Sequence, residues 1–273
     1  MWKGRSIVAL IILVGACLFG FGGWTLLKIA NDSNQTVTAP IARATPPIDS
    51  NYDVRAWFPI EDFDPNVAVF ETVFWDPRDT LSLRKLIRES GDFKDQQVLE
   101  IGTGSGLLSL CCLKAGAKSV VATDVNPAAV ENAVYNASRQ NFSEQMEVRQ
   151  VSEDQLTAFS TIKPEEQFDF IISNPPWVNQ RPRTYAEYAL FDEDFALMKS
   201  LFEGLPKHLK PKGRVLLAYG CVDAIKTIEK LAIEHQFEMI KHDSRDLDEL
   251  PAEFLPGFLV ELRFQPANKN KAE

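Results

Sequence analysis

The tetrapeptide Asn174-Pro175-Pro176-Trp177 directly follows an apolar stretch that predicts a buried strand. A planar NH2 group is a poor nucleophile because its lone pair is delocalised. The side-chain carbonyl of Asn174 and the backbone carbonyl of Pro175, held rigid by two prolines, can accept both N–H hydrogens of such a group. Trp177 can stack on its planar face. These four residues are predicted to be catalytic, by positioning and electrostatics; the alternative is a Pro-Pro turn with Trp177 in the core.

Three alternating glycines, Gly102, Gly104 and Gly106, follow the predicted strand that ends in Glu100-Ile101. Glycine tolerates a positive φ and lets the backbone approach a ligand closely. A dinucleotide-binding turn has glycines at its first, third and sixth positions, and the sixth position here is Leu107. The spacing therefore argues against a dinucleotide site.

Asp124 ends a second short apolar strand, about 20 residues after the first glycine. A carboxylate at this point can accept hydrogen bonds from both hydroxyls of a ribose. The alternative is that Asp124 caps the helix predicted over Pro127–Arg139. Asn126 suits the cap better, so we expect Asp124 to bind ligand.

The order of these features resembles the class I S-adenosyl-L-methionine (SAM) N-methyltransferases over residues 69–220. The shared features are Glu-x-Gly-x-Gly-x-Gly, an acid at residue 124 and Asn-Pro-Pro-aromatic. The nearest families are the HemK-like protein-glutamine methyltransferases and the small-domain methyltransferases. The resemblance implies SAM as cofactor and a planar nitrogen as methyl acceptor. It departs from the release-factor enzymes in having Trp177 instead of Tyr, and an apolar stretch where they carry a helical substrate domain.

The resemblance also extends to binding residues. An acid after the third strand usually faces the adenine amino group, a place that either Glu153 or Asp154 can take. The segment with Trp75, Pro77 and the pair Asp79-Thr80 resembles one that lies beside the cofactor in HemK-like enzymes; the alternative is a proline turn that caps the helix predicted over residues 81–89. The expected cofactor-binding residues are Glu100, Gly102, Thr103, Gly104, Gly106, Asp124, Val125, Glu153 and Asn174.

The expected acceptor is a glutamine or asparagine side-chain amide of a protein. The formal net charge is −9, whereas most proteins that bind the backbone of a nucleic acid carry a positive surface. Arginines and tyrosines at residues 181–188 can bind phosphate and stack on a base, whereas the acids at 192–194 repel a polyanion. Amino groups of adenine N6 or guanine N2 in RNA or DNA are therefore the alternative acceptors. A second alternative is a non-catalytic, membrane-tethered SAM-binding protein. The oligomeric state is left open.

Predicted strands alternate with helices along most of the chain. The strands are expected near residues 97–101, 119–123, 146–150, 168–173 and 213–219, followed by an antiparallel pair near 237–241 and 258–264. The pattern predicts an α/β fold with a doubly wound, Rossmann-like, seven-stranded methyltransferase sheet. Ligands bind at the carboxyl ends of strands in such sheets, where both motifs lie.

Residues 6–27 form an apolar stretch without charges, long enough to cross a bilayer as a helix. Trp2 and Trp24 lie near its ends, as interfacial aromatic residues do. A cleavable signal would have a shorter apolar core, so a single-pass N-terminal anchor is expected. Lys3 and Arg5 weakly favour a cytoplasmic N-terminus, but access to SAM favours a catalytic domain on the cytoplasmic face, and the orientation is left open.

The chain of 273 residues, 45% of them hydrophobic, is long enough for one large core. Four cysteines and three scattered histidines suggest neither a disulfide framework nor a metal site. The expected segments are a flank (1–5), a transmembrane anchor (6–28), a flexible linker (29–51), an N-terminal arm and helix (52–96), the methyltransferase domain (97–266) and a disordered tail (267–273).

Overall fold

The structure is a computed structural model that describes residues 51–61 and 63–265. The predicted anchor at residues 6–28, most of the linker at 29–51 and the tail at 267–273 lie outside these residues and stay predictions. Within the described part of the chain, no helix combines the length and the apolar character needed to cross a bilayer.

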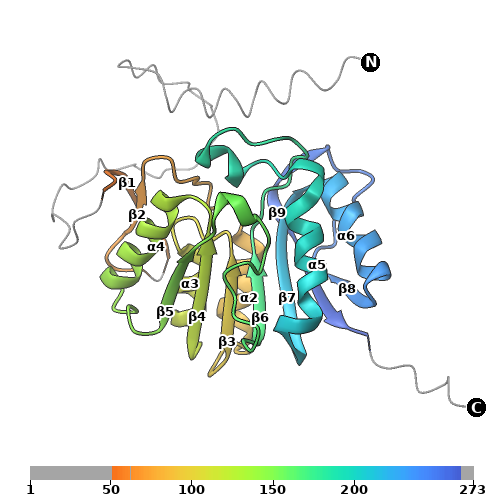
Figure 1. Ribbon diagram of the computed structural model, residues 1–273, viewed down its shortest axis with the longest axis horizontal. Coiled ribbons are helices and arrows are strands. Elements are labelled where there is room, and N and C mark those ends of the chain that lie inside the picture. Colours follow the sequence, from red (N-terminus) through yellow and green to blue (C-terminus); the bar gives the residue numbers. More distant parts are fainter. Residues whose placement is uncertain (1–50, 62, 266–273) are drawn as a thin grey trace, which may run out of the picture. The chain divides into compact units, whose positions relative to one another are not determined.

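Seven strands form the central sheet in the order β5-β4-β3-β6-β7-β9-β8, as Figure 1 shows. Strands β3 to β7 run parallel, and β9 is antiparallel to both of its neighbours. The predicted doubly wound sheet and its antiparallel closing pair are therefore confirmed. The strands are β3 (Gln97–Ile101), β4 (Ser119–Asp124), β5 (Met146–Gln150), β6 (Phe168–Ser173), β7 (Leu209–Cys221), β8 (Phe237–Lys241) and β9 (Glu253–Phe264).

Successive side chains of a strand point to opposite faces of the sheet, and here the side chains on both faces are apolar. Helices therefore cover both faces. Val98 and Ile172 face one layer, whereas Leu99 and Ile171 face the other. The first layer holds α2 (Leu81–Ser90), α3 (Leu107–Lys114) and α4 (Pro127–Arg139), and the second holds α5 (Ala196–His208) and α6 (Val222–Glu234). Strand order reverses between β3 and β6, so the carboxyl ends of these strands form the switch point.

A two-stranded hairpin, β1 (Val54–Phe58) with β2 (Val67–Phe70), precedes the sheet. Two buried asparagines of α4 bind the backbone of β2: Asn132 accepts from the Phe70 N–H (2.9 Å), and Asn136 accepts from the Ala68 N–H (2.9 Å). Asn136 Nδ2 also donates to the carbonyl of Ser105 in the glycine turn (2.8 Å). The hairpin, α4 and the glycine turn are thus joined by one hydrogen-bonded network.

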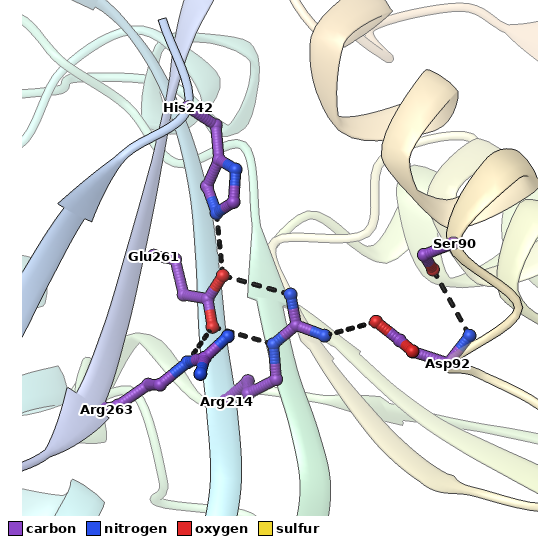
Figure 2. Close-up of polar contacts among 6 residues, drawn as sticks. All are labelled: Ser90, Asp92, Arg214, His242, Glu261 and Arg263. Carbon is purple, nitrogen blue, oxygen red and sulfur yellow. Dashed lines mark hydrogen bonds and ion pairs between the residues drawn. The ribbon is translucent and has the colours of Figure 1, made fainter.

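A buried ion cluster joins β7, β9 and the residue that directly follows β8 (Figure 2). The carboxylate of Glu261 on β9 has no solvent exposure. Arg214 of β7 donates to both of its oxygens (2.6 and 2.9 Å), Arg263 donates to Oε1, and His242 Nε2 lies 2.6 Å from Oε2. Arg214 also pairs with Asp92 (2.6 Å) beyond the end of α2. The cluster therefore ties the closing strands to the helical layer.

Candidate active site

The glycine turn and the Asn-Pro-Pro tetrapeptide leave the same edge of the sheet from adjacent strands. Ile101 and Ser173 are paired in the parallel register of β3 and β6, so the next residues are Gly102 and Asn174. The Ser173 hydroxyl donates to the Ile101 carbonyl at 2.6 Å and fixes the two strand ends together. The strand order therefore brings both motifs to one place, as the sequence predicted.

All three glycines of the turn adopt left-handed backbone geometry, with φ of 74°, 55° and 83°. The N–H groups of Gly102 and Thr103 both donate to the Thr123 carbonyl at 2.9 Å, which folds the turn against β4. A Cβ at Gly102 or Gly104 would meet no atom within 4 Å, whereas one at Gly106 would lie 3.1 Å from Ala133. The first two glycines thus leave open space for a ligand, and Gly106 permits close packing on α4.

Glu100 lies beneath this turn with 1% exposure. Its Oε2 accepts hydrogen bonds from the Thr103 hydroxyl (2.7 Å), the Ser109 N–H (3.1 Å) and the Ser109 hydroxyl. Burial raises the pKa of Glu100 to about 7, against the opposing effect of these hydrogen bonds. The carboxyl group therefore fastens the turn to the start of α3, besides facing the cavity.

Asp124 lies at the tip of β4. Its Oδ2 accepts from the Gly104 N–H (2.8 Å), and its Oδ1 accepts from the Asn126 N–H (2.9 Å). Burial raises the pKa of the Asp124 carboxyl, while these N–H groups act against the rise. The predicted helix cap is confirmed, because the Asn126 side chain accepts from the Ala128 N–H (3.0 Å).

A cavity of about 540 Å³ opens above the ends of β3, β4 and β6. Nine of the sequence-predicted residues line it: Glu100, Gly102, Thr103, Gly104, Asp124, Val125, Glu153, Asn174 and Pro176.

Four other sequence-predicted residues are not part of this lining. Gly106 packs against α4, and Pro175 lies between two lining residues. Asp154 is exposed, so of the two candidate acids only Glu153 borders the cavity. Trp177 packs against the core beneath α5 and α6, where a Cβ at Gly220 would lie 2.8 Å from the indole. The indole therefore packs on the core, and its stacking on an acceptor stays a prediction.

Asn174 has its two side-chain atoms in different environments. Nδ2 donates to Oδ2 of Asp79 at 2.7 Å. Oδ1 is buried and has no hydrogen-bond partner in the structure. A buried carbonyl without a partner is costly unless a ligand supplies a donor. Asn174, which lines the cavity, therefore holds a buried acceptor atom without a partner.

The segment after Trp177 forms the outer wall of the cavity. It contains the short helical turns η2 (Tyr185–Ala189) and η3 (Glu193–Phe195). The Tyr185 hydroxyl donates to the carboxylate of Glu153, which belongs to the turn η1 (Glu153–Gln155), at 3.0 Å. Asp192 is buried and accepts from the Leu197 N–H at 2.9 Å in the first turn of α5. These contacts join the outer wall to η1 and to the start of α5.

The comparisons with known proteins agree with this geometry. The family model described as ribosomal protein L11 methyltransferase (PrmA) matches residues 79–175. A putative protein N5-glutamine methyltransferase of Methanocaldococcus jannaschii is 32% identical over 154 residues, which cover 54% of this chain and 73% of the relative. The chain belongs to the HemK-like SAM-dependent methyltransferases.

Two further proteins are similar to this chain. A release factor glutamine methyltransferase of Cereibacter sphaeroides is 31% identical over 173 residues, which cover 56% of this methyltransferase and 60% of the relative. The crystal structure of ribosomal protein L11 methylase from Lactobacillus delbrueckii subsp. bulgaricus has a TM-score of 0.52 at 21% identity, covering 71% of this chain and 82% of that one. The second similarity shows the shared fold.

The cofactor of the methyltransferase is SAM, and the residues present fit it. The cavity volume lies in the range of small-molecule sites. The open sides of Gly102 and Gly104 leave room for close backbone contact. The carboxylates that border the cavity suit the positive sulfonium and ammonium groups of SAM.

Sequence reasoning assigned no catalytic role to Asp79, Tyr185 or Asp192. The Asp-Thr pair of Asp79 resembled a cofactor-side segment, whereas Tyr185 and Asp192 were noted only for their effect on a nucleic-acid acceptor. The contact of Asp79 with Asn174 joins residues 95 positions apart, which no local pattern reveals.

Proposed function

We propose that the methyltransferase transfers the methyl group of SAM to a side-chain amide of a protein, with glutamine as the favoured acceptor. One observation carries the proposal: the buried Oδ1 of Asn174, a residue that lines the cavity, has no hydrogen-bond partner. An NH2 group is one of the donors that can satisfy such a carbonyl. The names of the two glutamine methyltransferase relatives support an amide over other planar NH2 groups.

The charge of the cavity supports a protein acceptor over a nucleic acid. Among the described residues that line it, seven carry a carboxyl group and one, Arg181, carries a guanidinium. A phosphate backbone close to these carboxylates would be repelled. The carboxyl residues are Asp76, Asp79, Glu100, Asp124, Glu153, Asp192 and Glu193.

In this proposal, the protein positions the nitrogen of the acceptor amide by accepting hydrogen bonds from its two N–H groups. SAM, when bound, supplies an electrophilic methyl group on a sulfonium sulfur. Asn174 Oδ1 accepts one N–H of the acceptor amide, and the Pro175 carbonyl is proposed to accept the other. Both contacts localise the lone pair on nitrogen and orient it. Methyl transfer would form the N–C bond and break the C–S bond, which leaves a neutral thioether, and the nitrogen would release its proton to solvent, so no strongly basic side chain is required.

The acceptor class is testable with radiolabelled SAM. Full-length protein is incubated with methyl-labelled SAM and cell extract, and the products are treated with protease or nuclease. We expect the label to stay macromolecular after nuclease and to be released by protease. Acid hydrolysis should then release volatile methylamine, because an N-methyl amide is cleaved there whereas N-methylated lysine or arginine is not. Label that only nuclease releases would favour the adenine or guanine acceptor; no label in any fraction would contradict catalysis.

Asp124 is proposed to bind the ribose of SAM through the lone pairs that its N–H partners leave free. Asp124→Ala is expected to weaken SAM binding by about 10- to 100-fold, the effect of losing hydrogen bonds to a charged group. Isothermal titration calorimetry measures this affinity directly. The matched control is Asp154→Ala, an exposed acid outside the cavity lining, which should bind SAM as wild type does. Unchanged affinity in Asp124→Ala would contradict the ribose role.

A further inference from the structure

We propose that Asp79 is a positioning residue that holds the side-chain amide of Asn174 with its carbonyl directed at the acceptor nitrogen. The geometry points to this role because Asp79 Oδ2 accepts a hydrogen bond from Asn174 Nδ2 at 2.7 Å. The other end of the amide, Oδ1, has no hydrogen-bond partner. The catalytic part of the inference rests on the proposed function, whereas the orientation of the amide does not.

The backbone around Asp79 is fixed from two sides. A Cβ at Gly257 of β9 would lie 2.1 Å from the Asp79 carbonyl oxygen, so only glycine permits this approach. Ser82 donates from α2 to the Gly257 carbonyl at 2.9 Å. Arg84 donates to the Pro77 carbonyl at 2.8 Å, which closes the turn before α2. Asp79 is therefore a rigid support for Asn174, with 2% exposure.

The two ends of an asparagine amide have nearly the same shape, so its partners decide which end faces which way. A carboxylate only accepts hydrogen bonds and therefore selects the orientation with Nδ2 toward Asp79. A protonated carboxyl group can donate, which permits the reversed amide. The reversed amide would present Nδ2 to the acceptor nitrogen, and two donors would then face each other.

The protonation state of Asp79 changes in the neutral range. Burial raises the pKa of Asp79 to about 7, and Asp76 adds to the rise, while Asn174 and Arg84 act against it. Arg78 is held by Asp76 through a bidentate pair. On the side of β9, Arg245 donates to the Pro256 carbonyl at 2.9 Å. The selected amide orientation is therefore expected to prevail above about pH 7 and to be lost below it.

The kinetic test compares Asp79→Asn with wild type across about pH 5.5 to 9, using the acceptor that the labelling experiment identifies. Wild-type kcat should fall below about pH 7, where the carboxyl groups of Asp79 and Glu100 both gain a proton. Asp79→Asn should lower kcat by about 10- to 100-fold at high pH, the range for a misplaced catalytic group, and make the acid limb less steep. A wild-type kcat in the variant, or a lower kcat with an acid limb as steep as in wild type, would overturn the proposal.

Two neighbouring variants sharpen the kinetic test. Asp76→Asn removes a charge that raises the pKa of Asp79, so the acid limb should move to lower pH. Asp223→Asn makes the same chemical change at an exposed position on α6, outside the cavity lining, and should leave the profile as in wild type. An acid limb that stays fixed in Asp76→Asn would count against Asp79 as its source.

A second readout needs no acceptor. In full-length protein labelled with ¹⁵N-asparagine, the side-chain NH2 signal of Asn174, assigned by its loss in Asn174→Ser, should shift with a midpoint near pH 7. In Asp79→Asn the signal should not titrate over this range. If the chemical shift of this NH2 group did not change with pH in the wild type, the proposal would be overturned even if the enzyme were active. A titrating signal in a protein that methylates nothing would support the positioning contact and contradict only the proposed function.

Discussion

Replacing Asn174 with alanine is expected to lower kcat for methyl transfer by about 100-fold or more, the loss measured for one preorganised polar group at a reacting centre. The reason is that Oδ1 of Asn174, a residue that lines the cavity, is a buried acceptor without a partner. Its hydrogen bond to the acceptor nitrogen should strengthen as charge develops in the transition state, so its loss affects kcat. Affinity for SAM should stay close to wild type, because the glycine turn and Asp124 are unchanged. Steady-state kinetics and calorimetry on the same preparation separate the two effects.

Asn66→Ala provides the matched control, since Asn66 is exposed and outside the cavity lining. It should retain wild-type kcat and affinity. Thermal unfolding of both variants checks that the fold is intact, because Asn174→Ala also removes the partner of Asp79. Wild-type kcat in Asn174→Ala would remove Asn174 from the mechanism.

Most of the sheet could be predicted because parallel strands buried on both faces appear as short continuous apolar runs. The predicted limits of β3 and α4 match the structure, since a glycine turn ends the one and Asn126-Pro127 starts the other. The start of β7 could not be predicted. Pro211 and Gly213 suggest a turn, but the structure extends the strand through them with an irregular register against β6.

The site was predictable at the strand ends and not beyond them. Gly102, Asp124 and Asn174 follow apolar strands directly, so topology alone brings them together. Asp79 reaches Asn174 only because β9 carries Gly257 behind it, a packing relation across most of the chain. The indole of Trp177 packs on the core next to Gly220, which is another contact between residues far apart in the sequence. Such contacts depend on side-chain volume in three dimensions, which spacing along the sequence does not encode.

Glu261→Gln is expected to lower the free energy of unfolding by about 3–5 kcal/mol near neutral pH, the cost of breaking a buried ion pair. The variant leaves the guanidinium of Arg214, 16% exposed in its side chain, without its bidentate partner. It also places an amide NH2 group among donors from Arg214, Arg263 and His242, as the arrangement in Figure 2 indicates. Urea denaturation followed by circular dichroism measures the difference.

The effect should depend on pH in a defined direction. Burial alone would raise the pKa of Glu261, but the hydrogen bonds from Arg214, Arg263 and His242 outweigh it and lower the pKa to about 2. The ordinary value is 4.5, so the carboxylate contributes fully above about pH 4.5 and loses its contribution as pH falls toward 2. That shift corresponds to about 3 kcal/mol. The gap between wild type and Glu261→Gln should therefore be constant from about pH 7 to 5 and narrow below about pH 4.5.

Glu253→Gln is the matched control on the same strand. Burial raises the pKa of Glu253, so its carboxylate costs stability at neutral pH and its neutralisation should not destabilise the fold. If both variants unfolded at the same urea concentration as wild type, the cluster around Glu261 would contribute nothing. If both were destabilised equally at every pH, the loss would reflect strand β9 as a whole. Only a loss confined to Glu261→Gln that narrows in acid assigns the stability to the charge of Glu261.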